Sequence, residues 1–108
     1  MGLKIHISEL DINCFGSEGN INNIPYNKEI ERRLAYRYDQ LFKLFRRNKD
    51  KIQSVTTWGI ADDNTWLDFF YYNNGNYTYN ANKPRKNYPL LFDENHKPKK
   101  ALLEILEF

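Results

Sequence analysis

Lys4-Ile5-His6-Ile7-Ser8-Glu9-Leu10-Asp11 is the stretch that decides the fold of this 108-residue chain. Its alternating pattern predicts a β-strand over about residues 3–13, because successive side chains of a strand point to opposite faces. Glu9 and Asp11 then share one face with Ile5 and Ile7. Two carboxylates on the apolar face of a strand are costly unless they are paired or used in chemistry. Paired carboxylates can also present a nucleophile, so this strand end becomes a candidate site.

Further regular elements are predicted along the rest of the chain. A helix is expected over residues 27–48, where apolar residues recur at spacings of three and four: Ile30, Leu34, Tyr38, Leu41 and Phe45. The β-branched run at residues 52–60 predicts a second strand. A loop of more than 30 residues is expected over 61–97, and loops of that length are usually functional or disordered. The last helix is expected over 98–108, with Ala101, Leu102, Ile105 and Leu106 on its apolar face.

The order strand, helix, strand, helix favours an α/β fold. A helix of this length between two strands is typical of a crossover that makes the strands parallel. The notable polar and aromatic residues of both strands, Glu9, Asp11 and Trp58, lie at the carboxyl ends. In open α/β sheets and in α/β barrels, that edge binds the ligand.

Bulk composition excludes several classes of function. The net charge is +2, from 16 basic and 14 acidic residues, which is too balanced to predict a nucleic-acid or membrane surface. The basic run at 46–49 suits a helix C-terminus, and binding of a polyanion is the weaker alternative. Cys14 is the single cysteine, so no internal disulfide is possible and a catalytic role for it is disfavoured. His6 and His96 lie far apart with no metal-ligand spacing, so no metal site is predicted.

Aromatic residues make up an unusual 16% of the chain, and many lie in the polar stretch 66–88. Aromatic rings in polar loops suit sugar binding, because a pyranose stacks its C–H face on an aromatic plane. They also pack loops onto domains, and the sequence does not rank the two interpretations. The Asn- and Tyr-rich segment 68–86 could extend a binding cleft or have no role. Both alternatives stay open.

Three motifs together resemble one known family. They are Ile5-His6-Ile7-Ser8-Glu9-Leu10-Asp11; Ser54-Val55-Thr56-Thr57-Trp58-Gly59-Ile60-Ala61-Asp62-Asp63-Asn64-Thr65-Trp66-Leu67; and Tyr88-Pro89-Leu90-Leu91-Phe92-Asp93-Glu94-Asn95-His96-Lys97-Pro98-Lys99. They are similar to the seventh strand, the eighth strand with its loop, and the lead into the last helix of glycoside hydrolase family 10, the retaining endo-β-1,4-xylanases. The motifs occur in the family's order and spacing, and they cover nearly the whole chain.

The resemblance implies a role for each matching residue. Glu9 corresponds to the catalytic nucleophile, and Asp11 to a residue that supports it through a histidine on the preceding strand. Trp58 and Trp66 correspond to tryptophans that wall the sugar sites beside the scissile bond. The implied substrate is β-1,4-xylan or xylo-oligosaccharides, and the implied chemistry needs no cofactor and no metal.

The resemblance also implies a partial (β/α)8 TIM barrel. A complete barrel takes about 250 residues, so residues 1–108 are expected to be a C-terminal fragment equivalent to the last two βα units. The family's acid/base glutamate and the histidine that Asp11 would orient lie on earlier strands. We therefore expect this chain to carry the nucleophile half of a site, with the N-terminal part of the barrel as its partner.

Alternatives to catalysis remain at this stage. The chain could be a non-catalytic xylan-binding fragment, or an inactive truncated or split gene product whose Met1 is an internal methionine. Because family members are normally secreted, the parent protein is expected to be extracellular, although no signal peptide is recognisable before Lys4. No segment is apolar over the roughly 18 residues that a membrane span requires.

Overall fold

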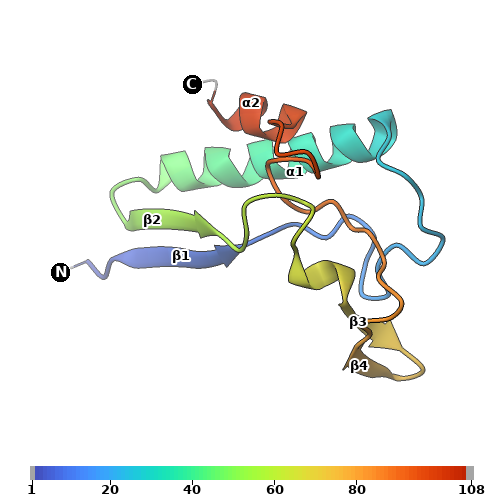
Figure 1. Cartoon of the computed structure of the whole chain (residues 1–108). Helices are drawn as coiled ribbons and strands as arrows, with labels where there is room; N and C mark the ends of the chain where they lie inside the picture. The colour runs from blue at the N-terminus through green and yellow to red at the C-terminus, as the bar shows by residue number, and fades with distance from the viewer. Residues whose placement is uncertain (1, 107–108) are drawn as a thin grey trace.

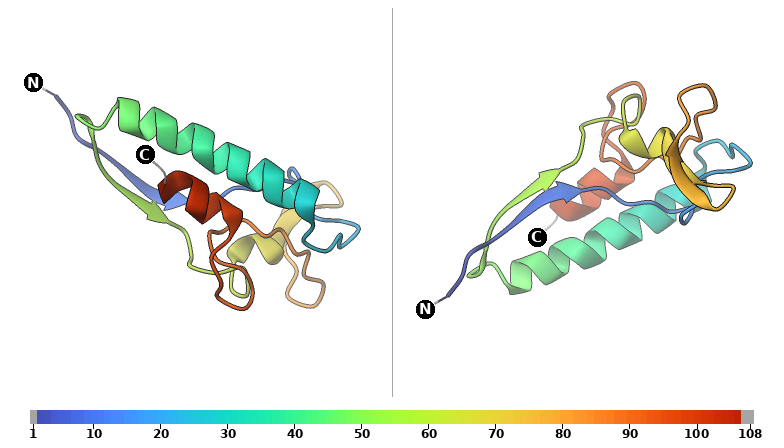
Figure 2. Two further views of the ribbon diagram at one scale, coloured as in Figure 1. Left: turned by 90° about the horizontal axis from the view of Figure 1, so that it is seen from above. Right: turned by 90° about the horizontal axis from the view of Figure 1, so that it is seen from below.

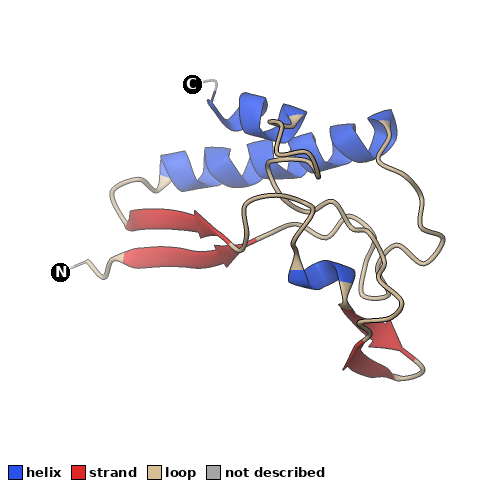
Figure 3. Cartoon of the chain, viewed as in Figure 1, coloured by secondary structure: helices blue, strands red, loops and turns tan. Residues whose placement is uncertain are grey.

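The computed structural model describes residues 2–106 of the chain. Its elements, in chain order, are β1 (Ile5–Leu10), α1 (Lys28–Arg47), β2 (Ile52–Thr57), the 3-10 turn η1 (Trp66–Asp68), β3 (Phe70–Asn73), β4 (Asn76–Tyr79) and α2 (Lys100–Leu106). Figure 1 shows this order by colour, and Figure 3 shows how much of the chain between β2 and α2 is irregular. The predicted order strand, helix, strand, helix is confirmed.

Strands β1 and β2 pair in parallel, as the crossover predicted. Both strands are shorter than expected. The second ends at Thr57 because Gly59 follows with φ of +120°, a backbone conformation that an extended strand does not contain. The carboxyl ends of the strands remain adjacent, since the backbone N–H of Trp58 donates to the carbonyl of Leu10 at 2.8 Å.

Helix α1 begins and ends where its sequence predicts. The Asn27 side chain accepts a hydrogen bond from the N–H of Ile30, which satisfies one of the unpaired donors of the first turn. Ile30, Leu34 and Tyr38 of the apolar stripe are buried. Leu34 and Tyr38 form the core together with Ala35, Ala101 and Ile105. The core therefore lies where α1 packs against α2.

Helix α2 differs from its prediction in two respects. It begins at Lys100, because Pro98 forms an isolated bridge with Phe92 and takes no part in the helix. Leu106 is 58% exposed, so it does not belong to the apolar face on which it was placed. The last two residues of the predicted helix lie outside the described residues.

The two helices form one layer, and the β1–β2 sheet forms a second layer. Figure 2 shows both helices over the same face of the β1–β2 sheet. Leu10 and Ile12 pack against the helical core, whereas Ile5 is 46% exposed. Among the described residues, β1 pairs with β2 alone, so each of these two strands has one edge without a neighbouring strand. This is the arrangement expected of βα units taken from a barrel.

The segment expected to be a long loop contains structure. After η1, strands β3 and β4 form an antiparallel hairpin that turns at Asn74 and Gly75, both of which have positive φ. The Tyr71 side chain is 2% exposed, and its hydroxyl donates to the carbonyl of Lys83. The hairpin is thus anchored to the domain, which sequence reasoning missed.

No helix within residues 2–106 is long and apolar enough to span a bilayer.

Candidate functional site

The structure brings all four predicted site residues to one edge of the sheet. Glu9 lies near the carboxyl end of β1, and Asp11 follows the strand directly. Trp58 follows β2, beside Leu10, through the backbone bond between the two strands. Trp66 begins η1, and its indole Nε1–H donates to Asp11 Oδ2 at 2.7 Å. Residues that are up to 57 positions apart in sequence therefore share one region.

The carboxylates differ in their surroundings. Glu9 is exposed, and within residues 2–106 its side chain forms no hydrogen bond and no ion pair. Asp11 is half-buried. Burial raises the pKa of Asp11, the Trp66 indole opposes this by donating to the carboxylate, and the negative charge of Glu9 raises the pKa further. Asp11 is therefore electrostatically linked to Glu9, and its hydrogen-bond partner in this chain is a tryptophan.

Both tryptophans are open to solvent. Trp58 is 47% exposed and Trp66 is 43% exposed, so neither is a core residue. Large apolar rings exposed beside carboxylates at the ligand edge of a sheet are costly in water and are typical of binding surfaces.

A buried ion pair holds the segment that connects the two tryptophans. Lys99 Nζ lies 2.7 Å from Asp62 Oδ2, and both side chains are at most 2% exposed. Asp62 Oδ1 also accepts from the N–H of Leu90, and Lys99 also donates to the carbonyl of Tyr88. Burial raises the pKa of Asp62 and lowers the pKa of Lys99, while their attraction opposes both shifts. The pair ties residue 62, midway between Trp58 and Trp66, to the start of α2.

A second buried carboxylate, that of Asp68, helps to fix the turn η1, in which Trp66 is the first residue. Asp68 Oδ1 accepts from the N–H of Asn87 at 2.9 Å. Asn87 is fully buried, and its side chain donates to the carbonyl of Leu67. Burial raises the pKa of Asp68, and the backbone bond from Asn87 opposes that shift. η1 is therefore fixed by polar contacts to residues about 20 positions later in the chain.

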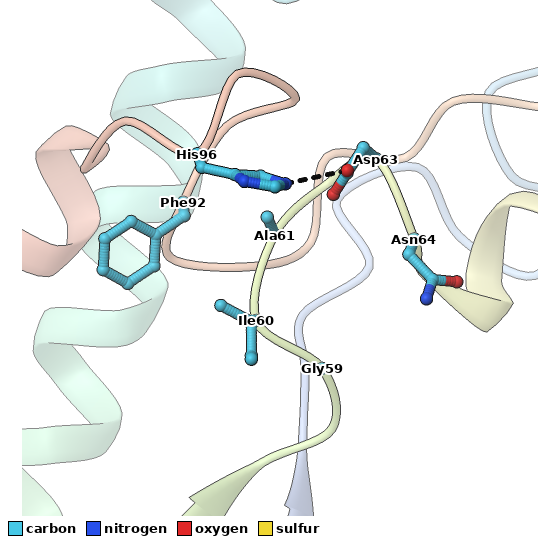
Figure 4. Close-up of a pocket in the computed structure, with 7 residues that line it drawn as sticks. All are labelled: Gly59, Ile60, Ala61, Asp63, Asn64, Phe92 and His96. Atoms are coloured by element: carbon cyan, nitrogen blue, oxygen red, sulfur yellow. Dashed lines mark hydrogen bonds and ion pairs between the residues drawn. The ribbon is translucent and has the colours of Figure 1, made fainter.

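A hollow of about 580 Å³ lies next to the end of β2 but does not include the predicted site residues. Its lining includes Ile60, Phe92, Asp63 and His96 (Figure 4). His96 Nε2 lies 2.8 Å from Asp63 Oδ2, although the two residues are 33 positions apart. Sequence spacing did not reveal this pair. Within residues 2–106, no group of three or more His, Cys, Asp or Glu side chains could hold a metal ion.

Cys14 lies away from this chemistry. It is partly buried and packs against the helical core beside Leu10 and Ile12. Burial raises the pKa of its thiol, which disfavours the reactive thiolate. Its position agrees with the structural role that the sequence favoured.

An α/β chain that gathers carboxylates and exposed tryptophans at the carboxyl edge of parallel strands matches the general arrangement of barrel enzymes. The family model described as "Glycosyl hydrolase family 10" matches residues 1–108. The chain belongs to this family, which confirms the resemblance of the three motifs. This family implies a (β/α)8 barrel fold, and the parallel strands and helices seen here agree with a part of such a barrel.

Named relatives agree with the family assignment. The chain is 44% identical over 108 residues to an endo-1,4-beta-xylanase of Geobacillus stearothermophilus, with 98% of this chain and 29% of the relative covered. It is 43% identical to endo-1,4-beta-xylanase A of Caldicellulosiruptor saccharolyticus, with 100% of this chain and 29% of the relative covered. The chain thus spans less than a third of the length of these xylanases.

Solved structures support the same conclusion. The endo-1,4-beta-xylanase of Caldicellulosiruptor owensensis superposes with a TM-score of 0.80 at 39% identity, over 98% of this chain and 30% of that structure. A second solved structure, an E139A mutant in complex with xylotriose, gives a TM-score of 0.81 at 39% identity, again over 98% of this chain and 30% of its own length. The fold of the described residues therefore agrees with the corresponding part, about 30%, of these structures.

Proposed function

We propose that this chain supplies the nucleophile half of a retaining glycoside hydrolase that cleaves β-1,4-xylan. Glu9 is the proposed nucleophile and Asp11 the residue that supports it. Trp58 and Trp66 are proposed to form the walls against which the sugar stacks. In barrel terms, β1–α1 and β2–α2 would be the last two of the eight βα units.

The observation that carries the proposal is the shared position of these residues in a chain of this family. Glu9 lies at the ligand edge of the sheet and is free of ion pairs and hydrogen bonds within the described residues, as a carboxylate that must reach a substrate requires. The Trp66–Asp11 hydrogen bond joins the aromatic wall to the carboxylate pair. Asp11 is drawn toward that wall and away from open water.

The chemistry follows the retaining mechanism. The Glu9 carboxylate attacks the anomeric carbon while a second carboxyl group protonates the departing glycosidic oxygen, which gives a covalent glycosyl–enzyme. Water then attacks the same carbon, and the second group, now a base, takes its proton. The two carboxyl groups must lie about 5 Å apart. We propose that the second carboxyl group comes from the N-terminal part of the barrel. We also propose that the parent protein is extracellular.

A second candidate is non-catalytic binding of xylan by this chain. The exposure of Trp58 and Trp66 favours it, because stacking on a ring needs no acid/base group. Binding that survives loss of Glu9 but fails on loss of Trp66, with no turnover in any assembled barrel, would favour this candidate.

The experiment restores the rest of the barrel. The chain is joined behind the preceding part of the Geobacillus stearothermophilus xylanase, in place of the region that it matches. Hydrolysis of an aryl β-xylobioside is then measured for the parent, for Glu9→Gln and for Glu18→Gln, a control at an exposed loop glutamate. We expect activity in the parent and the control and its loss in Glu9→Gln. Equal activity of all three would refute the assignment of Glu9.

A further inference from the structure

The β3–β4 hairpin gathers four aromatic rings on one face. Phe70 pairs with Tyr79 and Tyr72 pairs with Tyr77, directly across the antiparallel ladder. Side chains directly opposite each other in such a pair lie on the same face. These four residues, here called the aromatic face, are 38 to 64% exposed. A hairpin that directs four rings toward water is unusual, because folding alone would bury them.

The opposite face of the hairpin performs the anchoring. Tyr71 lies on it and is buried, with its hydroxyl bonded to the carbonyl of Lys83. The Arg85 guanidinium stacks over the Tyr71 ring at 3.8 Å from its centroid. The N–H of Tyr72 also donates to the carbonyl of Ser17 at 2.9 Å. Because one face is fixed to the domain, the aromatic face is held outward and is not needed for attachment.

The aromatic face continues the proposed sugar wall. The Trp66 and Phe70 ring centroids lie 5.8 Å apart, and those of Phe70 and Tyr79 lie 6.0 Å apart. Tyr72 and Tyr77 extend the row at 6.0 Å from each other. The rings are tilted by 47 to 65° within these hairpin pairs, so they form a ridged surface with several separate stacking positions. The row leads away from Trp66 and from the carboxylates beside it.

The composition of the hairpin segment indicates which class of ligand it suits. Residues 69–82 contain no charged side chain and include four tyrosines and five asparagines. A surface without positive charge does not suit a polyanion such as a nucleic acid. Phenol and amide groups between apolar rings instead suit a neutral ligand that offers C–H faces and hydroxyl groups together. A pyranose has both.

We infer that the aromatic face is a second stretch of glycan-binding surface, which stacks pyranose rings of a neutral β-1,4-linked chain beyond the Trp66 wall. The identity of that chain as xylan rests on the proposed function. Short oligosaccharides would occupy only the positions beside Trp58 and Trp66. Long chains would also contact Tyr77 and Tyr79, the two most exposed rings of the face.

Binding to the 108-residue chain itself tests the inference. Affinity for soluble xylan and for xylobiose is measured for the parent, for Tyr77→Ala/Tyr79→Ala and for Tyr36→Ala, a control at a 62% exposed tyrosine on α1. Far-ultraviolet circular dichroism checks that the variants retain the fold of the parent. We expect the hairpin variant to bind xylan about fivefold or more weakly, the scale of one lost aromatic contact, with xylobiose unchanged. The control should match the parent.

Several outcomes would overturn the inference. They are no binding of xylan by the parent, equal loss in the Tyr36→Ala control, or a hairpin variant that binds xylan like the parent. A parent that self-associates only through these tyrosines, without a change in xylan affinity, would assign the face to a second copy of the chain. Repeating the measurement in Glu9→Gln separates the two proposals. Xylan binding through the hairpin should persist there even if the nucleophile assignment fails.

Discussion

Breaking the buried Asp62–Lys99 pair is expected to destabilise the chain more than any exposed ion pair would. Asp62→Asn keeps an oxygen that can accept from the N–H of Leu90 but removes the charge opposite Lys99. Lys99→Met keeps the length of the side chain but removes both of its hydrogen bonds, to Asp62 and to the carbonyl of Tyr88. Each variant leaves one buried group without its partner.

The magnitude follows from burial. Both side chains are at most 2% exposed, so water cannot replace the lost partner. Removal of one partner of a buried ion pair costs about 3–5 kcal/mol. Replacement of both partners leaves no charge unpaired and therefore costs much less. The remaining cost is about 1–3 kcal/mol, because the buried carbonyl of Tyr88 loses its donor. The two single variants together cost about 6–10 kcal/mol and the double variant about 1–3 kcal/mol, so the coupling energy of the Asp62→Asn/Lys99→Met double-mutant cycle should be at least about 3 kcal/mol.

The pH dependence of the stability of the Lys99→Met variant provides an independent test of the buried pair. Burial already raises the pKa of Asp62, and without Lys99 the pKa should rise further. An acid whose pKa is higher in the folded than in the unfolded state binds more protons when folded, so its contribution to stability increases as the pH falls. The Lys99→Met variant should thus recover stability as the pH falls through the folded pKa of Asp62 toward the lower pKa that this group has in the unfolded chain.

Urea unfolding, followed by tryptophan fluorescence, measures these free energies. Lys43→Met is the matched control, because Lys43 pairs with Asp39 on α1 while 62% exposed. Such a pair contributes only about 0.5 kcal/mol. If each buried single variant costs no more than the control, or if the double variant costs the sum of both singles, the reasoning is refuted.

Three further predictions concern the site and its support. Trp66→Phe removes the indole donor to Asp11, so the pKa of Asp11 should rise further above its ordinary value; a carboxyl NMR titration that shows no rise contradicts this. Gly59→Ala should cost about 1–3 kcal/mol in chemical denaturation, because φ is +120° and the new Cβ would lie 2.9 Å from a Leu90 methyl carbon; an unchanged midpoint refutes the strain. Tyr38→Phe deletes the buried hydroxyl that satisfies a loop carbonyl, and a loss of about 1 kcal/mol is expected; thermal unfolding that matches the parent would contradict it.

The sequence predicted the elements with strong periodicity. Helix α1 was placed within one residue at each end, because the spacing of its apolar stripe is a local signal. The parallel pairing of the strands followed from the length of the crossover. The ends of the strands were placed too far out, because a positive φ at Gly59 is a property of the folded backbone.

The β3–β4 hairpin was not predicted, although its Asn74-Gly75 turn is a recognisable hairpin signal. The sequence of the hairpin shows no clear alternation of apolar and polar side chains, because both of its faces carry tyrosine. Tyr71 is buried and Tyr72 is exposed, and only packing against Arg85 and Lys83 decides between them. Which tyrosines are buried and which are exposed therefore depends on contacts that the sequence alone does not show.

The candidate site was found from motifs, and its supporting contacts were not. Glu9, Asp11, Trp58 and Trp66 came from resemblance, and the structure places them at one edge of the sheet. The Asp62–Lys99 pair is 37 residues apart and carries no local signal. The roles of the four residues stay predictions.

The most direct test of the central claim is to trap the glycosyl–enzyme intermediate. The chain, joined behind the preceding part of the Geobacillus stearothermophilus xylanase, is treated with a 2-fluoro xylobioside that carries a good leaving group. The labelled peptide is then sequenced by mass spectrometry. We expect one added disaccharide per chain, attached to the carboxylate of Glu9. The Glu9→Gln variant should carry no such label. A label on any other residue would contradict the assignment of Glu9 as the nucleophile. So would an active barrel in which the Glu9→Gln variant is labelled like the parent.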